Sequence, residues 1–194
     1  FGAAALDELR AKFPKNFIHC GISEQAMLDI ATGLALEKNK VFVYAMAPFL
    51  SLRAIEQVKC GPGLMKLPIC MISVGIGLGY ADAGPTHYAN EDFSCFRSLP
   101  NFVVLSPCDS NEMFQAVKAI TKYNGPVYMR TGRSIVKNLT NPNKKFVIGK
   151  GLVLNKGKKI CIISTGMQTS IALNAIKHLK KIKINPTLIH MPSI

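Results

Sequence analysis

Features that define several protein classes are missing from this 194-residue sequence. No apolar run approaches the roughly 20 residues that a membrane-spanning helix needs. The chain also does not open with the basic-then-apolar pattern of a signal peptide. Its six cysteines form no C-x-x-C pair, so zinc-ribbon and thioredoxin-like sites have no support. Because 48% of the residues are hydrophobic, we expect a soluble, cytoplasmic, globular protein with reduced and mostly buried thiols.

Acidic residues are absent from the last third of the chain. Residues 1–133 contain 13 Lys and Arg and all 11 Asp and Glu, whereas residues 134–194 contain 11 Lys and no acid. Such asymmetry is found in nucleic-acid-binding proteins. However, no Phe, Tyr or Trp follows Phe146, so bases would find no stacking platform between the lysines. We therefore expect a solvated basic face and regard nucleic-acid binding as the weaker alternative.

Short apolar runs alternate with helical patterns over most of the chain, which predicts a parallel sheet with helices on both faces. The predicted strands are Phe17–Cys20, Lys40–Tyr44, Pro68–Val74, Phe102–Leu105 and Pro126–Met129. The predicted helices are Ser23–Glu37, Leu50–Lys59, Asn90–Ser98 and Asn111–Tyr123.

A polar, turn-rich stretch then interrupts this pattern. We predict a first domain at 1–133, a linker at 134–147, and part of a second, smaller α/β domain at 148–194. The second domain is expected to contain strands near Leu152–Leu154, Lys159–Ser164 and Thr187–Met191, and a helix at Thr169–Lys181. Both ends fall within or beside a predicted element, so we expect a section of a longer chain.

Three polar motifs follow predicted strands. Glu24 opens a helix after a glycine turn, Asp82 and His87 lie on a long glycine-rich loop, and Arg130 and Arg133 end a strand. Each motif also has a simple structural explanation: an acid complements the dipole of a helix N-terminus, and loop histidines and paired arginines are often solvated. Because strands of a parallel sheet end at one edge, we expect the three motifs to converge there on a ligand.

The glycines of the loop do not form a dinucleotide-binding fingerprint. In Gly75-Ile-Gly77-Leu-Gly79-Tyr80 the residue three after Gly77 is Tyr80, where the fingerprint requires glycine.

In these motifs the sequence resembles the transketolase family, which includes deoxyxylulose-phosphate synthase. The resemblance spans nearly the whole chain, in the family's order. The matching pieces are Phe17-Ile-His-Cys-Gly-Ile-Ser-Glu24-Gln25, Phe49-Leu-Ser-Leu-Arg53-Ala-Ile-Glu-Gln-Val, Gly84-Pro-Thr-His87 with Glu91-Asp92, Phe96-Arg97-Ser-Leu-Pro-Asn, Ser106-Pro-Cys-Asp109 and Gly125-Pro-Val-Tyr-Met-Arg130-Thr-Gly-Arg133.

The resemblance implies a pyrimidine-binding domain of a thiamine-diphosphate enzyme, followed by the start of the family's C-terminal domain. It implies that Glu24 hydrogen-bonds the cofactor's pyrimidine ring and activates it, while Phe49 packs on that ring and Met46 stands at another aromatic position of the pocket. It further implies that His87 and Asp82 contact substrate hydroxyls, His87 with a catalytic role, and that Arg133 binds a substrate phosphate. Arg53 matches a position of the same helix to which we assign no role.

The sequence departs from the family at several points. One more residue separates Phe49 from Arg53 than relatives usually have, and Ala83 is another apparent insertion. No basic phosphate ligand stands near Ser73, which argues against a phosphorylated substrate. The Gly-Asp-Gly…Asn motif that holds Mg²⁺ and the diphosphate in the family is missing, so we expect another chain or segment to supply that domain.

The resemblance therefore implies one component of a homodimeric, thiamine-diphosphate- and Mg²⁺-dependent transferase that moves a two-carbon ketol unit from a sugar or 2-keto acid to an aldehyde. This component is expected to be inactive alone. One alternative is deoxyxylulose-phosphate synthase, an enzyme of isoprenoid biosynthesis. Another, of a different class, is a non-catalytic regulatory or scaffold homologue.

Overall fold

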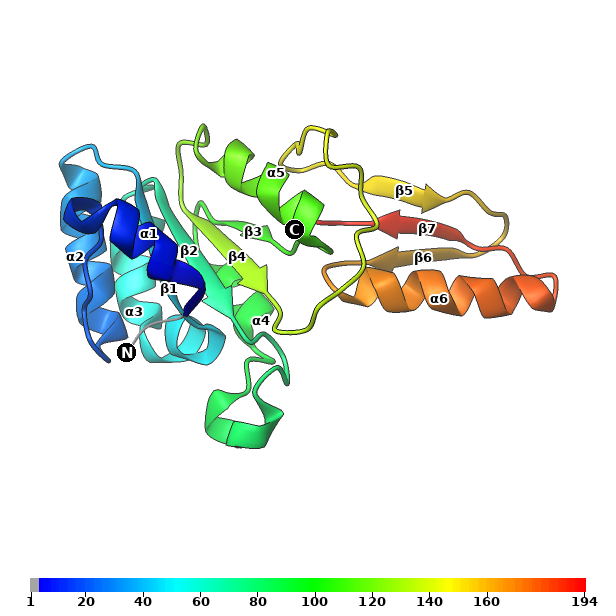
Figure 1. Ribbon diagram of the computed structural model, residues 1–194, viewed down its shortest axis with the longest axis horizontal. Coiled ribbons are helices and arrows are strands. Elements are labelled where there is room, and N and C mark those ends of the chain that lie inside the picture. Colours follow the sequence, from blue (N-terminus) through cyan, green and yellow to red (C-terminus); the bar gives the residue numbers. More distant parts are fainter. Residues whose placement is uncertain (1–3) are drawn as a thin grey trace.

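The computed structural model describes residues 4–194 and shows two lobes, each built on its own sheet (Figure 1). In the broad lobe the strand order is β1-β2-β4-β3, and every neighbouring pair is parallel. These strands are β1 (Val41–Met46), β2 (Ile69–Val74), β3 (Val103–Leu105) and β4 (Val127–Thr131). The parallel α/β sheet expected from the sequence is confirmed.

Helices cover both faces of this sheet. They are α2 (Glu24–Leu36), α3 (Ile55–Val58), α4 (Asp92–Ser98) and α5 (Ser110–Ile120), whereas α1 (Asp7–Lys12) has no buried residue and lies outside the core. On one face Leu28 of α2 and Phe96 of α4 share a core with Met71 of β2. On the other face Ile120 of α5 shares a core with Cys70, the preceding residue of β2. Because successive strand residues point to opposite faces, a strand covered on both sides is apolar throughout.

The narrow lobe has three strands in the order β5-β7-β6, with α6 lying along one face (Figure 1). These elements are β5 (Leu152–Asn155), β6 (Cys161–Ser164), α6 (Gln168–Lys181) and β7 (Thr187–His190). β7 is parallel to β6 but antiparallel to β5, so this sheet is mixed. Among the helices of residues 4–194, none is long and apolar enough to cross a membrane.

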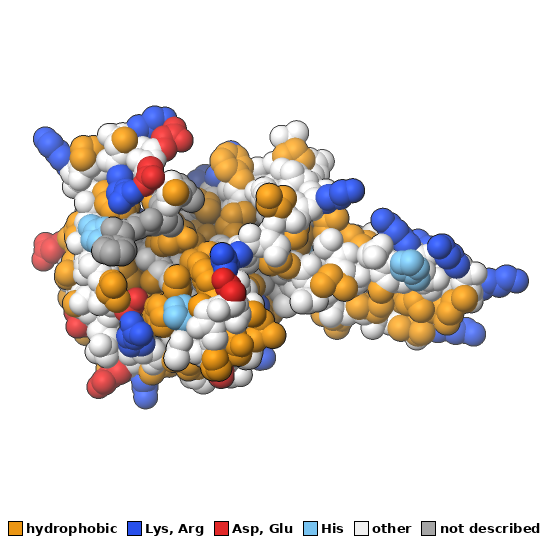
Figure 2. Space-filling model, turned by 60° about the horizontal axis from the view of Figure 1, so that its bottom comes forward, with side chains coloured by type: hydrophobic (Ala, Val, Ile, Leu, Met, Phe, Trp, Pro, Cys, Tyr) orange, Lys and Arg blue, Asp and Glu red, His pale blue; other side chains and the backbone are white. Residues whose placement is uncertain are grey.

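The two lobes differ in surface charge. Figure 2 shows acidic and basic side chains mixed over the broad lobe, whereas the charged side chains visible on the narrow lobe are all Lys or Arg. This follows directly from the absence of acidic residues after Glu112.

The segment between the lobes is packed against α5, although it contains no helix or strand. Asp109, the N-cap of α5, accepts a hydrogen bond from the backbone N–H of Thr140 at 2.7 Å, and Phe146 is buried. Beyond β7 the chain returns to the edge of β3, where Ser106 N donates to Pro192 O at 2.8 Å. These bonds join the narrow lobe to the broad one.

Two predictions of secondary structure were wrong. Residues 17–20 form no strand, and Ile18 is 56% exposed. An apolar run becomes a strand only where a sheet edge accepts its hydrogen bonds, and here it does not reach one. The predicted helix Leu50–Lys59 is a short α3 between two π-helical turns, at Phe49–Arg53 and Lys59–Gly63.

Candidate functional site

The predicted motifs meet at the carboxyl edge of the four-stranded sheet. β1, β2 and β4 are adjacent and parallel, so the segments that follow them leave the sheet side by side. Gly75 N donates to Thr131 O at 3.0 Å and ties the ends of β2 and β4 together. α2 runs back toward β1, which brings the N-terminus of α2 to the same edge. The convergence expected from the sequence is present in the structure.

Glu24 is the first residue of α2, and its side chain is only 11% exposed. Gly21, with φ of 68°, makes the turn that leads into the helix, a conformation that favours glycine. The Glu24 carboxylate accepts a hydrogen bond from Arg53, with 3.0 Å between Nη1 and Oε2. A carboxylate so largely removed from water, at the start of a helix, is well placed to bind a polar ring nitrogen.

Arg53 also covers Phe49. Its guanidinium carbon lies 4.1 Å from the centre of the Phe49 ring, which is a cation–π contact. Both residues belong to the π-helical turn Phe49–Arg53, and this turn coincides with the extra residue noted in the sequence. Because a π turn accommodates one residue more than an α turn, the insertion widens the helix locally and leaves Arg53 beside both Glu24 and Phe49. Sequence patterns alone assigned Arg53 no role.

His87 packs edge-on against Phe49, with 5.4 Å between ring centres and 68° between ring planes. Thr86 Oγ1 lies 3.0 Å from its Nδ1, a contact that orients the imidazole. His87 therefore lies next to the Glu24–Arg53–Phe49 cluster, although it is 63 positions after Glu24 in the chain.

Arg133 forms the far end of the same group. Its guanidinium stacks over the Tyr80 ring at 4.1 Å, donates to Gly79 O at 3.1 Å and lies 3.6 Å from Asp82. The Asp82 side chain is 81% exposed, so this ion pair is open to solvent. Tyr80, whose ring centre is 6.3 Å from that of His87, connects the two ends of the site. Tyr80 escaped prediction because its only sequence signal was a failed glycine spacing.

Met46 is less closely joined to this group. It is the last residue of β1 and is half-buried. None of the hydrogen bonds, ion pairs or ring contacts found in residues 4–194 connects Met46 to Glu24 or Phe49.

The sequence left open whether Arg130 binds a ligand. In the structure it is not available to an anion. It makes two hydrogen bonds to the fully buried Asp92, at 2.7 and 3.0 Å, and stacks on Phe93 at 3.6 Å. Tyr128 donates a third hydrogen bond to Asp92 at 3.0 Å. Asp92 and Arg130 therefore form a structural ion pair whose hydrogen-bonding groups are already occupied within the protein.

Comparison with known proteins gives a consistent family assignment. Residues 3–138 match the model of the transketolase pyrimidine binding domain, and residues 149–194 match that of the transketolase C-terminal domain. The whole chain is 32% identical to one subunit of the apulose-4-phosphate transketolase of Phocaeicola vulgatus and covers 62% of that subunit. It is 30% identical, over 95% of its length, to 1-deoxy-D-xylulose-5-phosphate synthase of Syntrophomonas wolfei, of which it covers 29%.

A solved structure described as "Split gene transketolase, inactive beta4 tetramer" superposes on the whole chain with a TM-score of 0.91 and 32% identity. The chain covers 63% of that structure, so it spans less than two thirds of each of these relatives. The family models, the relatives and the superposed structure agree, and the chain belongs to the transketolase family.

Proposed function

We propose that this chain is the cofactor-activating component of a thiamine-diphosphate-dependent, transketolase-type enzyme. The enzyme would transfer a two-carbon ketol unit from a ketose, or from a decarboxylated 2-keto acid, to an aldehyde acceptor. The observation that carries this proposal is the Glu24–Arg53–Phe49 cluster, where a carboxylate that is 11% exposed lies beside an aromatic ring at the carboxyl edge of the sheet.

The residues present fit the pyrimidine half of the cofactor. A carboxylate and an aromatic face are the two groups that an aminopyrimidine needs, and the flat, hydrogen-bonding guanidinium of Arg53 contacts both. Glu24 would hold the ring nitrogen and Phe49 the ring face once Arg53 turns aside. The bound cofactor supplies the carbanion chemistry, and this chain's residues orient and activate it.

The residues do not fit the diphosphate and its Mg²⁺. In residues 4–194 the only group of three or more candidate metal ligands lies at the junction of the lobes, away from Glu24. The Gly-Asp-Gly motif is also absent from the sequence. We therefore propose that a partner subunit, or another segment of the same polypeptide, holds the metal and the diphosphate. Two similar proteins are described as one subunit of a transketolase and as a split-gene transketolase that is inactive as a tetramer of β chains, which supports the need for a partner.

On the substrate side, His87 would donate to or accept from a hydroxyl or carbonyl oxygen of the sugar, and Asp82 would bind a second hydroxyl. Arg133 is the basic residue on this side of the site, and its contact with Asp82 at 3.6 Å is long enough to be exchanged for an anion. Ser73 is buried and donates to Met129 O, and no basic side chain stands at this position to hold a phosphate. Among the described residues on this side of the site, Arg133 is thus the one basic group that could bind an anionic substituent, and a ketose is the substrate class that we propose.

The first test is capture of the full-length protein from its native extract, with the masses and sequences of its partners determined. A partner, or an extension of the same chain, that carries Gly-Asp-Gly…Asn would supply the missing half of the site. If neither is found, the non-catalytic alternative takes precedence.

Substrate choice in the reconstituted enzyme separates the catalytic alternatives. Turnover of ketose donors without pyruvate supports the transketolase-type reaction, whereas turnover only with pyruvate and glyceraldehyde 3-phosphate identifies a deoxyxylulose-phosphate synthase. Absence of turnover, together with an unchanged biological role of Glu24→Gln, would identify a regulatory or scaffold protein.

A further inference from the structure

A second polar centre lies at the junction of the two lobes, apart from the candidate site. Cys108 precedes α5, Glu112 lies in the first turns of α5, and His190 ends β7. All three side chains are buried, and their sulfur, oxygen and nitrogen atoms lie within 4.8 Å of one another. The fold thus brings a thiol, a carboxylate and an imidazole together from both lobes.

The carboxylate at this centre is only half satisfied. Glu112 Oε2 lies 2.7 Å from His190 Nε2 and accepts the backbone N–H of Cys108 at 2.8 Å. Its other oxygen, Oε1, is buried and has no hydrogen-bond partner among the described residues. Buried carboxylate oxygens without partners are rare because each forfeits its hydration without compensation. An oxygen of this kind is free to bind a cation.

Hydrogen bonds at Nδ1 fix the orientation of the His190 imidazole. Thr169 Oγ1 lies 2.7 Å from His190 Nδ1, and Ser164 Oγ lies 2.9 Å from Thr169 Oγ1. Thr169 and His190 are fully buried, so this chain of hydrogen bonds keeps Nε2 directed at Glu112. Histidines that bind metals are usually oriented by such a hydrogen bond to the other ring nitrogen.

We propose that Cys108, Glu112 and His190 bind one Zn²⁺, which joins the narrow lobe to α5. Thiolate sulfur, imidazole nitrogen and carboxylate oxygen are the donors of protein zinc sites. Zn²⁺ with one thiolate, one carboxylate and one neutral imidazole has no net charge, which suits a buried position. Coordination breaks the Cys108 S–H bond and forms a Zn–S bond, and the thiol proton leaves to solvent. The neutral His190 binds through Nε2 and keeps its ring proton on Nδ1.

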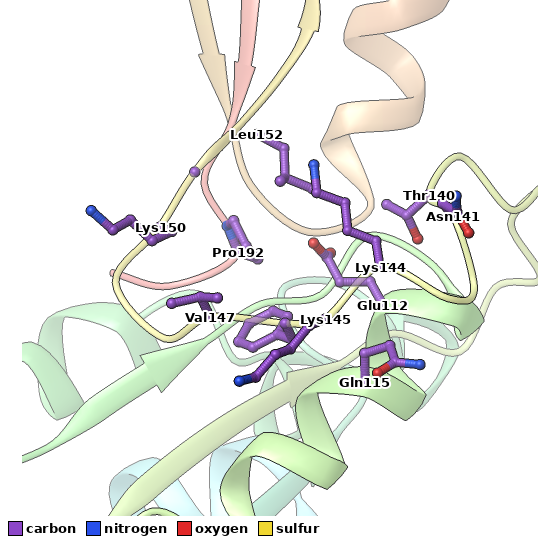
Figure 3. A pocket seen from close by; sticks show the side chains of 12 residues that line it. Glu112, Gln115, Thr140, Asn141, Lys144, Lys145, Val147, Lys150, Leu152 and Pro192 are labelled. Atoms are coloured by element: carbon purple, nitrogen blue, oxygen red, sulfur yellow. The ribbon is translucent and has the colours of Figure 1, made fainter.

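A cavity of about 240 Å³ adjoins this centre. Glu112 is the one proposed ligand that lines it, together with Lys144, Lys145 and Lys150. Figure 3 shows the Glu112 carboxylate pointing from α5 into this space, with Lys144 and Leu152 on one side and Pro192 on another. The cavity lies between α5, the segment that joins the lobes, and β5. Because its ligands would come from α5 and β7, an ion held by them would set how the two lobes lie against each other.

The decisive experiment measures metal in the full-length, tag-free protein. After incubation with Zn²⁺ and removal of excess, we expect one equivalent per chain. Replacement by Co²⁺ should give the near-ultraviolet charge-transfer band of a thiolate–Co²⁺ bond. Cys108→Ser should abolish that band, and Glu112→Gln and His190→Asn should lower metal content at least tenfold.

Matched controls use the same residue types elsewhere on the narrow lobe. Cys161→Ser and His178→Asn, at exposed positions, should keep both the metal and the band. Glu24→Gln should also keep them, which separates this site from the proposed catalytic one.

A folded wild-type protein that retains less than a tenth of an equivalent of Zn²⁺ and gives no thiolate–Co²⁺ band would overturn the proposal. Equal loss in the Cys161→Ser control would do the same. If the junction variants fail to fold, the wild-type Co²⁺ spectrum still decides whether a thiolate binds the ion.

Discussion

Two carboxylate–arginine pairs in the broad lobe have the same chemistry and different surroundings. Asp92 and Arg130 lie below the site, with side-chain exposures of 0% and 11%, and two hydrogen bonds join them. Glu24 and Arg53 lie at the sheet edge, with exposures of 11% and 46%, and one contact joins them. Each arginine also stacks on an aromatic ring. The difference shows how burial decides whether a pair is structural or can be exchanged for a ligand.

The physical reason is the cost of desolvating charge. Removing one partner of a buried pair leaves the other as an unpaired charge shielded from water, which is strongly destabilising. An exposed partner is instead rehydrated, and the pair contributes little to stability. Glu24 and Arg53 can therefore separate when a ligand replaces the contact, whereas Asp92 and Arg130 cannot.

The largest expected effect follows from breaking the buried pair. Asp92→Ala leaves Arg130 without its ion-pair partner and Tyr128 without its hydrogen-bond acceptor. We therefore expect the unfolding free energy to fall by roughly 3–5 kcal/mol. Glu24→Ala should cost no more than about 1 kcal/mol. Urea unfolding of both variants measures the contrast, and equal losses would contradict it.

The next effect is on catalysis, without a comparable change in stability. In the reconstituted enzyme Glu24→Gln should reduce kcat at least about 100-fold, because the carboxyl group that activates the cofactor is lost. Its unfolding midpoint should stay near that of the wild type. Glu56→Gln, an exposed acid on α3, is the matched control and should keep full activity. Unchanged turnover in Glu24→Gln would exclude the proposed role.

Alkaline pH should distinguish buried from exposed thiols. Burial raises the pKa of the Cys70 thiol from 9.0 to about 12, with Lys40 opposing this only in part. Above pH 9 the unfolded chain releases this proton and the folded chain keeps it. Stability should therefore fall between pH 9 and pH 12, by roughly 1 kcal/mol per pH unit for this group.

Urea unfolding across that range, compared with Cys70→Ala, isolates the Cys70 contribution. The exposed Cys60 provides the control, since Cys60→Ala should leave the slope unchanged. An identical slope in wild type and Cys70→Ala would show that this thiol does not contribute.

The smallest expected effect concerns Arg53. Because Arg53 makes the two contacts that the pyrimidine would take, Arg53→Ala should tighten thiamine diphosphate binding to the assembled enzyme a few-fold, or about 1 kcal/mol. Arg97→Ala, at an exposed position of α4, should leave the affinity unchanged. Titration calorimetry gives both values. Weaker binding in Arg53→Ala would show instead that Arg53 holds Glu24 in place for the cofactor.

The site was predictable where its residues follow strands. Strands β1, β2 and β4 are recognisable as apolar runs, and parallel topology then forces the residues after them to one edge. Phe17–Cys20 has the same apolar signal but joins no sheet, so the prediction of a strand failed there. The sequence could not distinguish the roles of Arg130 and Arg133, because the buried Asp92 that binds Arg130 belongs to α4, 38 residues earlier in the chain.

The sequence by itself determined the alternation of strands and helices, the basic character of the narrow lobe and the glutamate at the start of α2, because these depend on local pattern and composition. Tertiary structure alone decided that Arg53 covers Phe49, that Tyr80 joins the two ends of the site, and that His190 meets Glu112 from 78 residues away. Such contacts depend on burial and on the approach of distant segments, and neither is encoded in the spacing of neighbouring residues.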